Sequence, residues 1–99
     1  LFDIVRSKVR VLVAYCTPAL LTRPWCAGEI TTAFRSRVPI ISVQTPLFQA
    51  PTSEQLRCLG SYIDLAGVSL GKYGISLEDV AQAFRALGTE ASGKTVVLA

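Results

Sequence analysis

The chain has 99 residues, of which 51% are hydrophobic and 8% aromatic, enough for one small globular domain with a single core. Its formal net charge of +3 comes from scattered cations without interleaved aromatic side chains, which argues against a nucleic-acid partner. No apolar run approaches the roughly 18–20 uninterrupted residues that span a bilayer, so we predict no membrane span in this segment.

The cysteines and the missing histidines restrict the chemistry further. The three cysteines (Cys16, Cys26 and Cys58) are odd in number and lack CxxC spacing, which favours a reducing compartment and a cytoplasmic location. Without histidine, the chain by itself cannot form the common zinc ligand sets, Ser-His-Asp triads or Cys-His dyads. Because the chain starts with Leu1 and not Met, we expect it to be a piece of a longer protein.

The first third of the chain predicts a helix end, a strand and a second helix. Residues 1–7 are typical of the end of a helix. Residues 9–15 are β-branched and apolar almost throughout, the pattern of a strand covered on both faces in a parallel sheet. Thr22 is the expected N-cap of the next helix, and Pro24 suits its first turn. We expect this helix to end near residues 35–37, where cations suit a helix C-terminus.

A second strand and a third helix follow. Residues 38–43 predict a buried strand, and residues 44–51, with two prolines, predict a loop. Thr52 and Gln55 have the spacing of a capping box, which predicts a helix from there to Tyr62.

The remaining pattern is less uniform. Residues 64–75 contain three glycines that break any helix, and residues 66–70 are a candidate for a short third strand. Ser76 and Asp79 have the spacing of a second capping box. An amphipathic helix follows and is expected to stop at Gly88.

The order of these elements predicts an α/β fold. Strands that alternate with helices at these spacings form a parallel sheet with right-handed connections. The pattern agrees with the second half of a flavodoxin-like, three-layer sheet flanked by helices, with about three strands present. We assign residues 1–88 to this partial domain and residues 89–99 to a tail or linker. Residues 95–98 are interpreted as a strand of the next unit or as disordered.

The helix after the first strand carries the main candidate site. Helical spacing predicts one apolar stripe along it, formed by Cys26, Ile30, Ala33 and Phe34. A shoulder beside this stripe is formed by Trp25, Glu29 and Thr32. A carboxylate at the rim of a buried face is well placed for chemistry. The helix dipole also favours an acidic residue near a helix N-terminus with no function implied, so this second interpretation of Glu29 stays open.

The run from Val11 to Ile30 resembles the centre of a TIR (Toll/interleukin-receptor) domain. Residues 25–30 read Trp-Cys-Ala-Gly-Glu-Ile and match the family's Trp-Cys-x-x-Glu-Leu/Ile motif without a gap. Residues 17–18, Thr-Pro, stand where the family usually has its Ser-x pair. The resemblance covers roughly residues 1–88 and lacks the family's first two strands, whose loops contribute to ligand binding and self-assembly.

The resemblance implies two functions. Some TIR domains hydrolyse NAD+ with the glutamate of this motif, and others assemble signalling complexes, including those of innate immunity. The first function implies Glu29 as the catalytic carboxylate and Trp25 as a wall of the pocket, with NAD+ as a substrate and no cofactor or metal. We expect Tyr15, Thr17 and Pro18 to line the same pocket, because they lie at the carboxyl end of the first strand, where open α/β sheets bind ligands. In the alternative, a non-enzymatic module associates with other TIR domains and Glu29 only stabilises its helix. A flavodoxin- or receiver-like domain fits less well, because nothing resembles an FMN phosphate loop.

One further motif lies near the C-terminus. Residues 88–95 satisfy the phosphate-binding pattern GxxxxGK[ST]. A phosphate-binding loop of this kind needs a strand before it and a helix after it. Here a predicted helix precedes the motif and a β-branched run follows, so we interpret it as a linker with a chance match.

Overall fold

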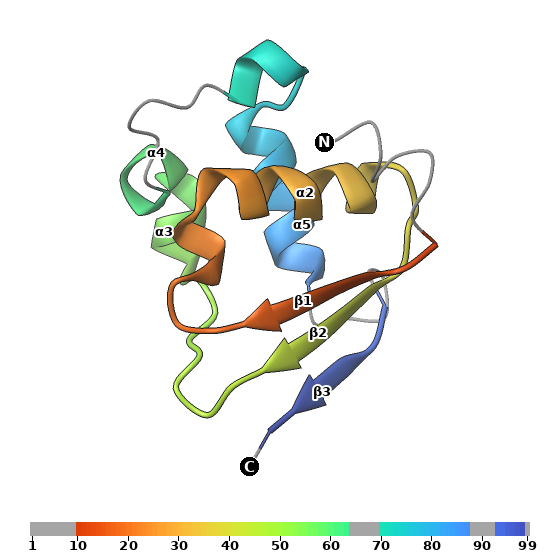
Figure 1. Ribbon diagram of the computed structural model, residues 1–99. Coiled ribbons are helices and arrows are strands. Elements are labelled where there is room, and N and C mark those ends of the chain that lie inside the picture. Colours follow the sequence, from red (N-terminus) through yellow and green to blue (C-terminus); the bar gives the residue numbers. More distant parts are fainter. Residues whose placement is uncertain (1–9, 64–69, 88–92, 99) are drawn as a thin grey trace.

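The computed structural model describes residues 10–63, 70–87 and 93–98 (Figure 1). The predicted helix end over residues 1–7 and part of the ambiguous stretch 64–75 lie outside these described residues. The described elements, in chain order, are β1 (Leu12–Cys16), the 3-10 helix η1 (Leu20–Thr22), α2 (Pro24–Arg35), β2 (Ile40–Gln44), α3 (Ser53–Arg57), α4 (Leu59–Tyr62), the 3-10 helix η2 (Leu70–Tyr73), α5 (Leu77–Ala86) and β3 (Thr95–Val97).

The three described strands form one parallel sheet. Its order is β1-β2-β3, with Ala14 opposite Ser42 and Ser42 opposite Thr95. The parallel sheet with helices confirms the α/β class. The first predicted strand begins three residues later than expected, at Leu12, and the second begins two residues later, at Ile40.

The described helices lie on one side of this sheet (Figure 1). On that side Ala14, Cys16 and Ile40 are buried. On the other side Val13 and Tyr15 are 58% and 55% exposed. The prediction that the first strand is covered on both faces is therefore wrong for the described residues, because no described helix packs against the second face.

Helix α2 begins one residue later than the predicted cap implies, although Pro24 lies in its first turn as expected. Pro24 is its first residue, where the missing N–H has no helical partner to lose. The N-cap is Arg23, without a side-chain hydrogen bond, and not Thr22 as predicted. The Thr22 hydroxyl instead donates to the Ala19 carbonyl at 2.7 Å, within the turn of η1. The helix ends at Arg35, as expected.

Helix α2 buries more than the single stripe that its sequence predicts. Besides Ile30 and Ala33, the residues Ala27, Gly28, Thr31 and Thr32 are buried, whereas Cys26 and Phe34 are only half-buried. The reason is that α2 contacts the sheet on one side and α5 on the other (Figure 1). The two buried threonines donate to carbonyls one turn earlier in the helix, so their hydroxyls stay hydrogen-bonded.

Both predicted capping boxes are present. The two pairs are Thr52–Gln55 and Ser76–Asp79. In each pair the hydroxyl of the N-cap residue accepts from the backbone N–H of the third helical residue, and the side chain of that third residue accepts from the backbone N–H of the N-cap residue. The hydrogen bonds from Ser76 hold the pKa of Asp79 below its usual value, and Arg35 adds to this effect. The helix predicted from residue 52 to residue 62 divides into α3 and α4, because Cys58 leaves the helical conformation at φ −123° and ψ 52°.

The third strand comes from the segment that the sequence places in a tail. Thr95–Val97 pairs with β2, whereas Leu70, the described end of the stretch considered for a third strand, begins η2. Gly93 makes this pairing possible. Its φ of +144° is unfavourable for other residues, and an added Cβ would lie 2.9 Å from the Ile40 nitrogen and against the Ile40 carbonyl oxygen.

The end of the phosphate-binding pattern therefore belongs to the sheet. The Lys94 carbonyl accepts from the Ser42 N–H at 2.9 Å, and Thr95 begins β3. Helix α5 precedes the motif and a strand follows it, the reverse of the order that such a loop requires. The structure thus agrees with a chance match.

We expect Gly93→Ala to destabilise the protein by about 1–3 kcal/mol, because alanine would be strained at this φ and would clash with the backbone of β2. Urea unfolding followed by circular dichroism measures the change. Gly60→Ala is the matched control, since a Cβ there meets only the Leu77 side chain, at an ordinary 3.9 Å. Equal stability of the two variants would contradict the close approach of Gly93 to Ile40.

Candidate functional site

Glu29 lies in a small surface depression between β1 and α2. The depression has a volume of about 110 Å³. It is lined by residues from β1, η1 and α2, namely Leu12, Val13, Ala14, Tyr15, Leu20, Cys26, Glu29 and Ile30. Two of the predicted site residues, Glu29 and Tyr15, are among its lining, but the Tyr15 side chain lies on the face of β1 that points away from α2, so only Glu29 directs a side chain into it from the helix.

The position of Glu29 follows from the way α2 packs. Glu29 stands one residue before Ile30, which is buried. Its own side chain is half-buried, at the rim of the helix where α2 faces β1. Since β1 is the outer of the described strands on this side, the depression lies along the edge of the described sheet.

The other three predicted site residues lie elsewhere. Thr17 and Pro18 form the turn after β1, and the Thr17 N–H donates to the Tyr15 carbonyl at 2.9 Å. Neither lines the depression. Trp25 does not line it either: its ring meets the ring of Tyr73 edge-on, with centroids 5.4 Å apart. In this structure Trp25 thus fastens η2 to the start of α2.

Cys26, which also lines the depression, interacts electrostatically with Glu29. Burial raises the pKa of the Cys26 thiol, and the Glu29 carboxylate raises it further, while Arg23 lowers it. A thiol with a raised pKa is mostly protonated at neutral pH and is a poor nucleophile. Cys26 therefore acts as a wall of the depression, and Glu29 is the only carboxylate among its described lining residues.

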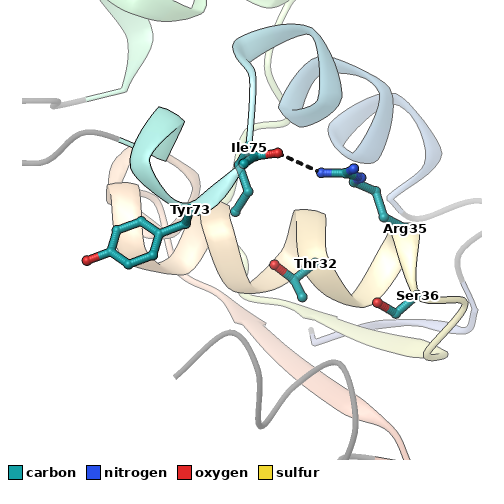
Figure 2. A pocket seen from close by; sticks show the side chains of 6 residues that line it. Thr32, Arg35, Ser36, Tyr73 and Ile75 are labelled. Atoms are coloured by element: carbon teal, nitrogen blue, oxygen red, sulfur yellow. Dashed lines mark hydrogen bonds between the residues drawn. The ribbon is translucent and has the colours of Figure 1, made fainter.

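A second, larger hollow lies between α2 and the turn that leads into α5 (Figure 2). Its volume is about 350 Å³, and Thr32, Arg35, Ser36, Tyr73, Gly74 and Ile75 line it. Arg35 closes one side, because its guanidinium donates to the Gly74 carbonyl at 3.0 Å and pairs with Asp79 at 3.4 Å. These contacts join residues about forty positions apart in the sequence, and no local motif predicted them.

The two hollows differ in the chemistry that they offer. The carboxylate of Glu29 can accept hydrogen bonds from sugar hydroxyls or face a developing positive charge. Arg35 is already paired, so the larger hollow offers mainly hydroxyl groups and an aromatic ring.

Among the described residues no three His, Cys, Asp or Glu side chains gather as a metal site would need. None of the described helices has the length and apolar character to cross a membrane.

The alkylation rate of Cys26 reports on the carboxylate beside it. In Glu29→Gln, we expect iodoacetamide to modify Cys26 several-fold faster at constant pH, since removal of the negative charge lowers the pKa of the thiol. Mass spectrometry of peptides resolves Cys26 from exposed Cys58 and buried Cys16. Glu54→Gln, on an exposed turn of α3, is the control. An unchanged rate in Glu29→Gln would mean that the carboxylate points away from Cys26.

Comparison of the chain with protein-family models, curated proteins and solved structures finds no match. The resemblance to a TIR domain therefore rests on the residues between Val11 and Ile30. What it implies about activity is a proposal, which the geometry around Glu29 supports.

Proposed function

We propose that the chain is part of a TIR-type signalling domain that cleaves NAD+ to nicotinamide and ADP-ribose, with Glu29 as the catalytic carboxylate. One observation carries this proposal: Glu29 is half-buried in a depression between β1 and α2. A glutamate that served only to stabilise the N-terminus of its helix would need no such enclosure.

The chemistry requires little more than one fixed carboxylate. Nicotinamide leaves as a neutral base, because the bond breaks from a cationic pyridinium and the electron pair goes to the ring nitrogen. No acid has to protonate the leaving group. The ribose is left with oxocarbenium character, like the sugar in glycosidase transition states, and water completes the hydrolysis. A carboxylate held close to that positive charge stabilises the transition state more than the ground state.

The size of the depression limits what it holds. Ligand pockets usually have volumes of about 300–1,000 Å³, and this one has about 110 Å³. We therefore place only the ribose in the depression, beside Glu29. The rest of the dinucleotide needs further walls, which the resemblance assigns to the family's first loops.

We expect Glu29→Gln to lower NAD+ cleavage at least about 100-fold while the thermal unfolding curve stays unchanged, because the amide has the same shape but no charge. Release of nicotinamide, measured by chromatography, reports the activity. The protein is assayed free in solution and clustered on vesicles through an affinity tag. Glu54→Gln is the control. Cleavage that survives Glu29→Gln would remove Glu29 from catalysis.

A second candidate function is non-enzymatic assembly with other TIR domains, and the face of the sheet that no described helix covers favours it. This face presents apolar side chains from β1 and β3, where Val13, Tyr15 and Val96 are all well exposed. Parallel sheets are normally covered on both faces. A contiguous exposed apolar surface is typical of a site that contacts protein.

If assembly uses this face, Val13→Lys should abolish self-association, because the added charge would have to be buried in the contact. Light scattering after size-exclusion chromatography measures the mass of the particles. Leu47→Lys is the control, since Leu47 is also exposed but lies in the loop after β2. A wild-type chain that stays monomeric at high concentration and shows no NAD+ cleavage would contradict both candidate functions.

A further inference from the structure

A groove separates the short helices α3 and α4 from α5, at a distance from the depression that holds Glu29. Its volume is about 330 Å³. The two sides lie next to each other in the fold (Figure 1), since both α3 and α4 contact α5. The apolar lining comes from both sides and consists of Leu56, Leu59, Leu77 and Ala81.

The apolar lining is partly open to solvent. Leu77, in the first turn of α5, is 38% exposed, although it belongs to the apolar stripe of that helix. Leu56 is half-buried, and Leu59 and Ala81 are buried below it. Gly60 leaves the side of α4 without a side chain, so that the groove stays open next to Leu77. The volume lies at the lower end of the range for pockets that take ligands.

Two arginines stand at the rim of the groove, one from each side. Arg57 ends α3 and Arg85 lies in the last turn of α5, and both are exposed. Neither forms an ion pair with a carboxylate of the described residues. Glu78 is the one acidic side chain of the lining, so the rim carries a net positive charge.

We propose that this groove docks a segment of a partner protein in which a large apolar side chain is flanked by carboxylates. The apolar side chain occupies the space between Leu56 and Leu77, where it removes exposed apolar surface from water. The flanking carboxylates pair with Arg57 and Arg85, whose forked guanidinium groups suit this geometry. The proposal does not depend on NAD+ cleavage.

A nucleic acid is the less suitable occupant. Binding of single strands relies on a basic path along the backbone together with aromatic side chains on which bases stack. The groove has two cations, one carboxylate and an aliphatic lining, and no aromatic residue belongs to its described lining. A peptide with an apolar side chain between carboxylates would use both the aliphatic lining and the two cations.

The first experiment measures fluorescence anisotropy with a short fluorescein-labelled peptide that has a central Leu-Phe pair between runs of Asp and Glu. We expect micromolar binding that weakens as salt is added, and a loss of at least about tenfold in the variant Arg57→Glu/Arg85→Glu. Arg10→Glu/Lys72→Glu changes the net charge equally at exposed positions outside the groove and is the matched control. Equal weakening in both variants would overturn the proposal, since only the overall charge would then matter.

The second experiment separates the groove from its charges. Gly60→Phe should fill the groove and abolish peptide binding, whereas Gly60→Ala should bind normally, because an added Cβ has ordinary space there. Thermal unfolding shows that both variants remain folded. Unchanged binding in a folded Gly60→Phe protein would overturn the proposal. So would displacement of the peptide by a uridine oligonucleotide whose own binding depends on Arg57 and Arg85.

Discussion

The packing of α2 on two sides determines most of this structure. The helix packs against β1 and β2 and also against α5, and its fully buried small residues, such as Ala27 and Ala33, suit this close packing. A larger side chain at either position would have to displace the neighbouring side chains. Arg35 then ties the C-terminal end of α2 to the start of α5 through Gly74 and Asp79. The order of the layers thus depends on this one helix.

The same packing gives the motif residues of α2 different tasks. Trp25 and Glu29 are one helical turn apart, yet Trp25 meets the ring of Tyr73 while Glu29 faces the depression beside β1. The aromatic residue of the motif contributes to the attachment of η2, and the carboxylate is left at a partly enclosed surface. This separation is consistent with the proposal that Glu29 carries chemistry and that Trp25 supports the fold around it.

The remaining surfaces differ in what they offer a partner. The face of the sheet opposite α2 is apolar and uncharged at its centre, as suits a broad contact with a similar domain. The groove between α3, α4 and α5 is narrow and has cations at its rim, as suits a single anchoring side chain with acidic neighbours. The two surfaces belong to different sides of the protein, so the two kinds of contact do not compete.

Local signals in the sequence were sufficient to determine several elements. The α/β class, the position of Pro24 in the first turn of α2, and the capping boxes at Thr52 and Ser76 depend on residues within one helical turn or on the alternation of apolar segments, and all were predicted. The placement of Glu29 at the rim of a buried face was also predicted, because helical periodicity fixes it.

Only the tertiary structure decided which segments meet. The third strand comes from Thr95–Val97, and this depends on the close approach of Gly93 to Ile40, more than fifty residues earlier. The contacts of Arg35 and Trp25 with residues 73–79 likewise join distant parts of the chain. Such contacts follow from how the helices cross and how the strands pair, and neither leaves a periodic signal in the sequence. For the same reason the sequence predicted two covered sheet faces, since apolar strands do not reveal whether a second layer of helices is present.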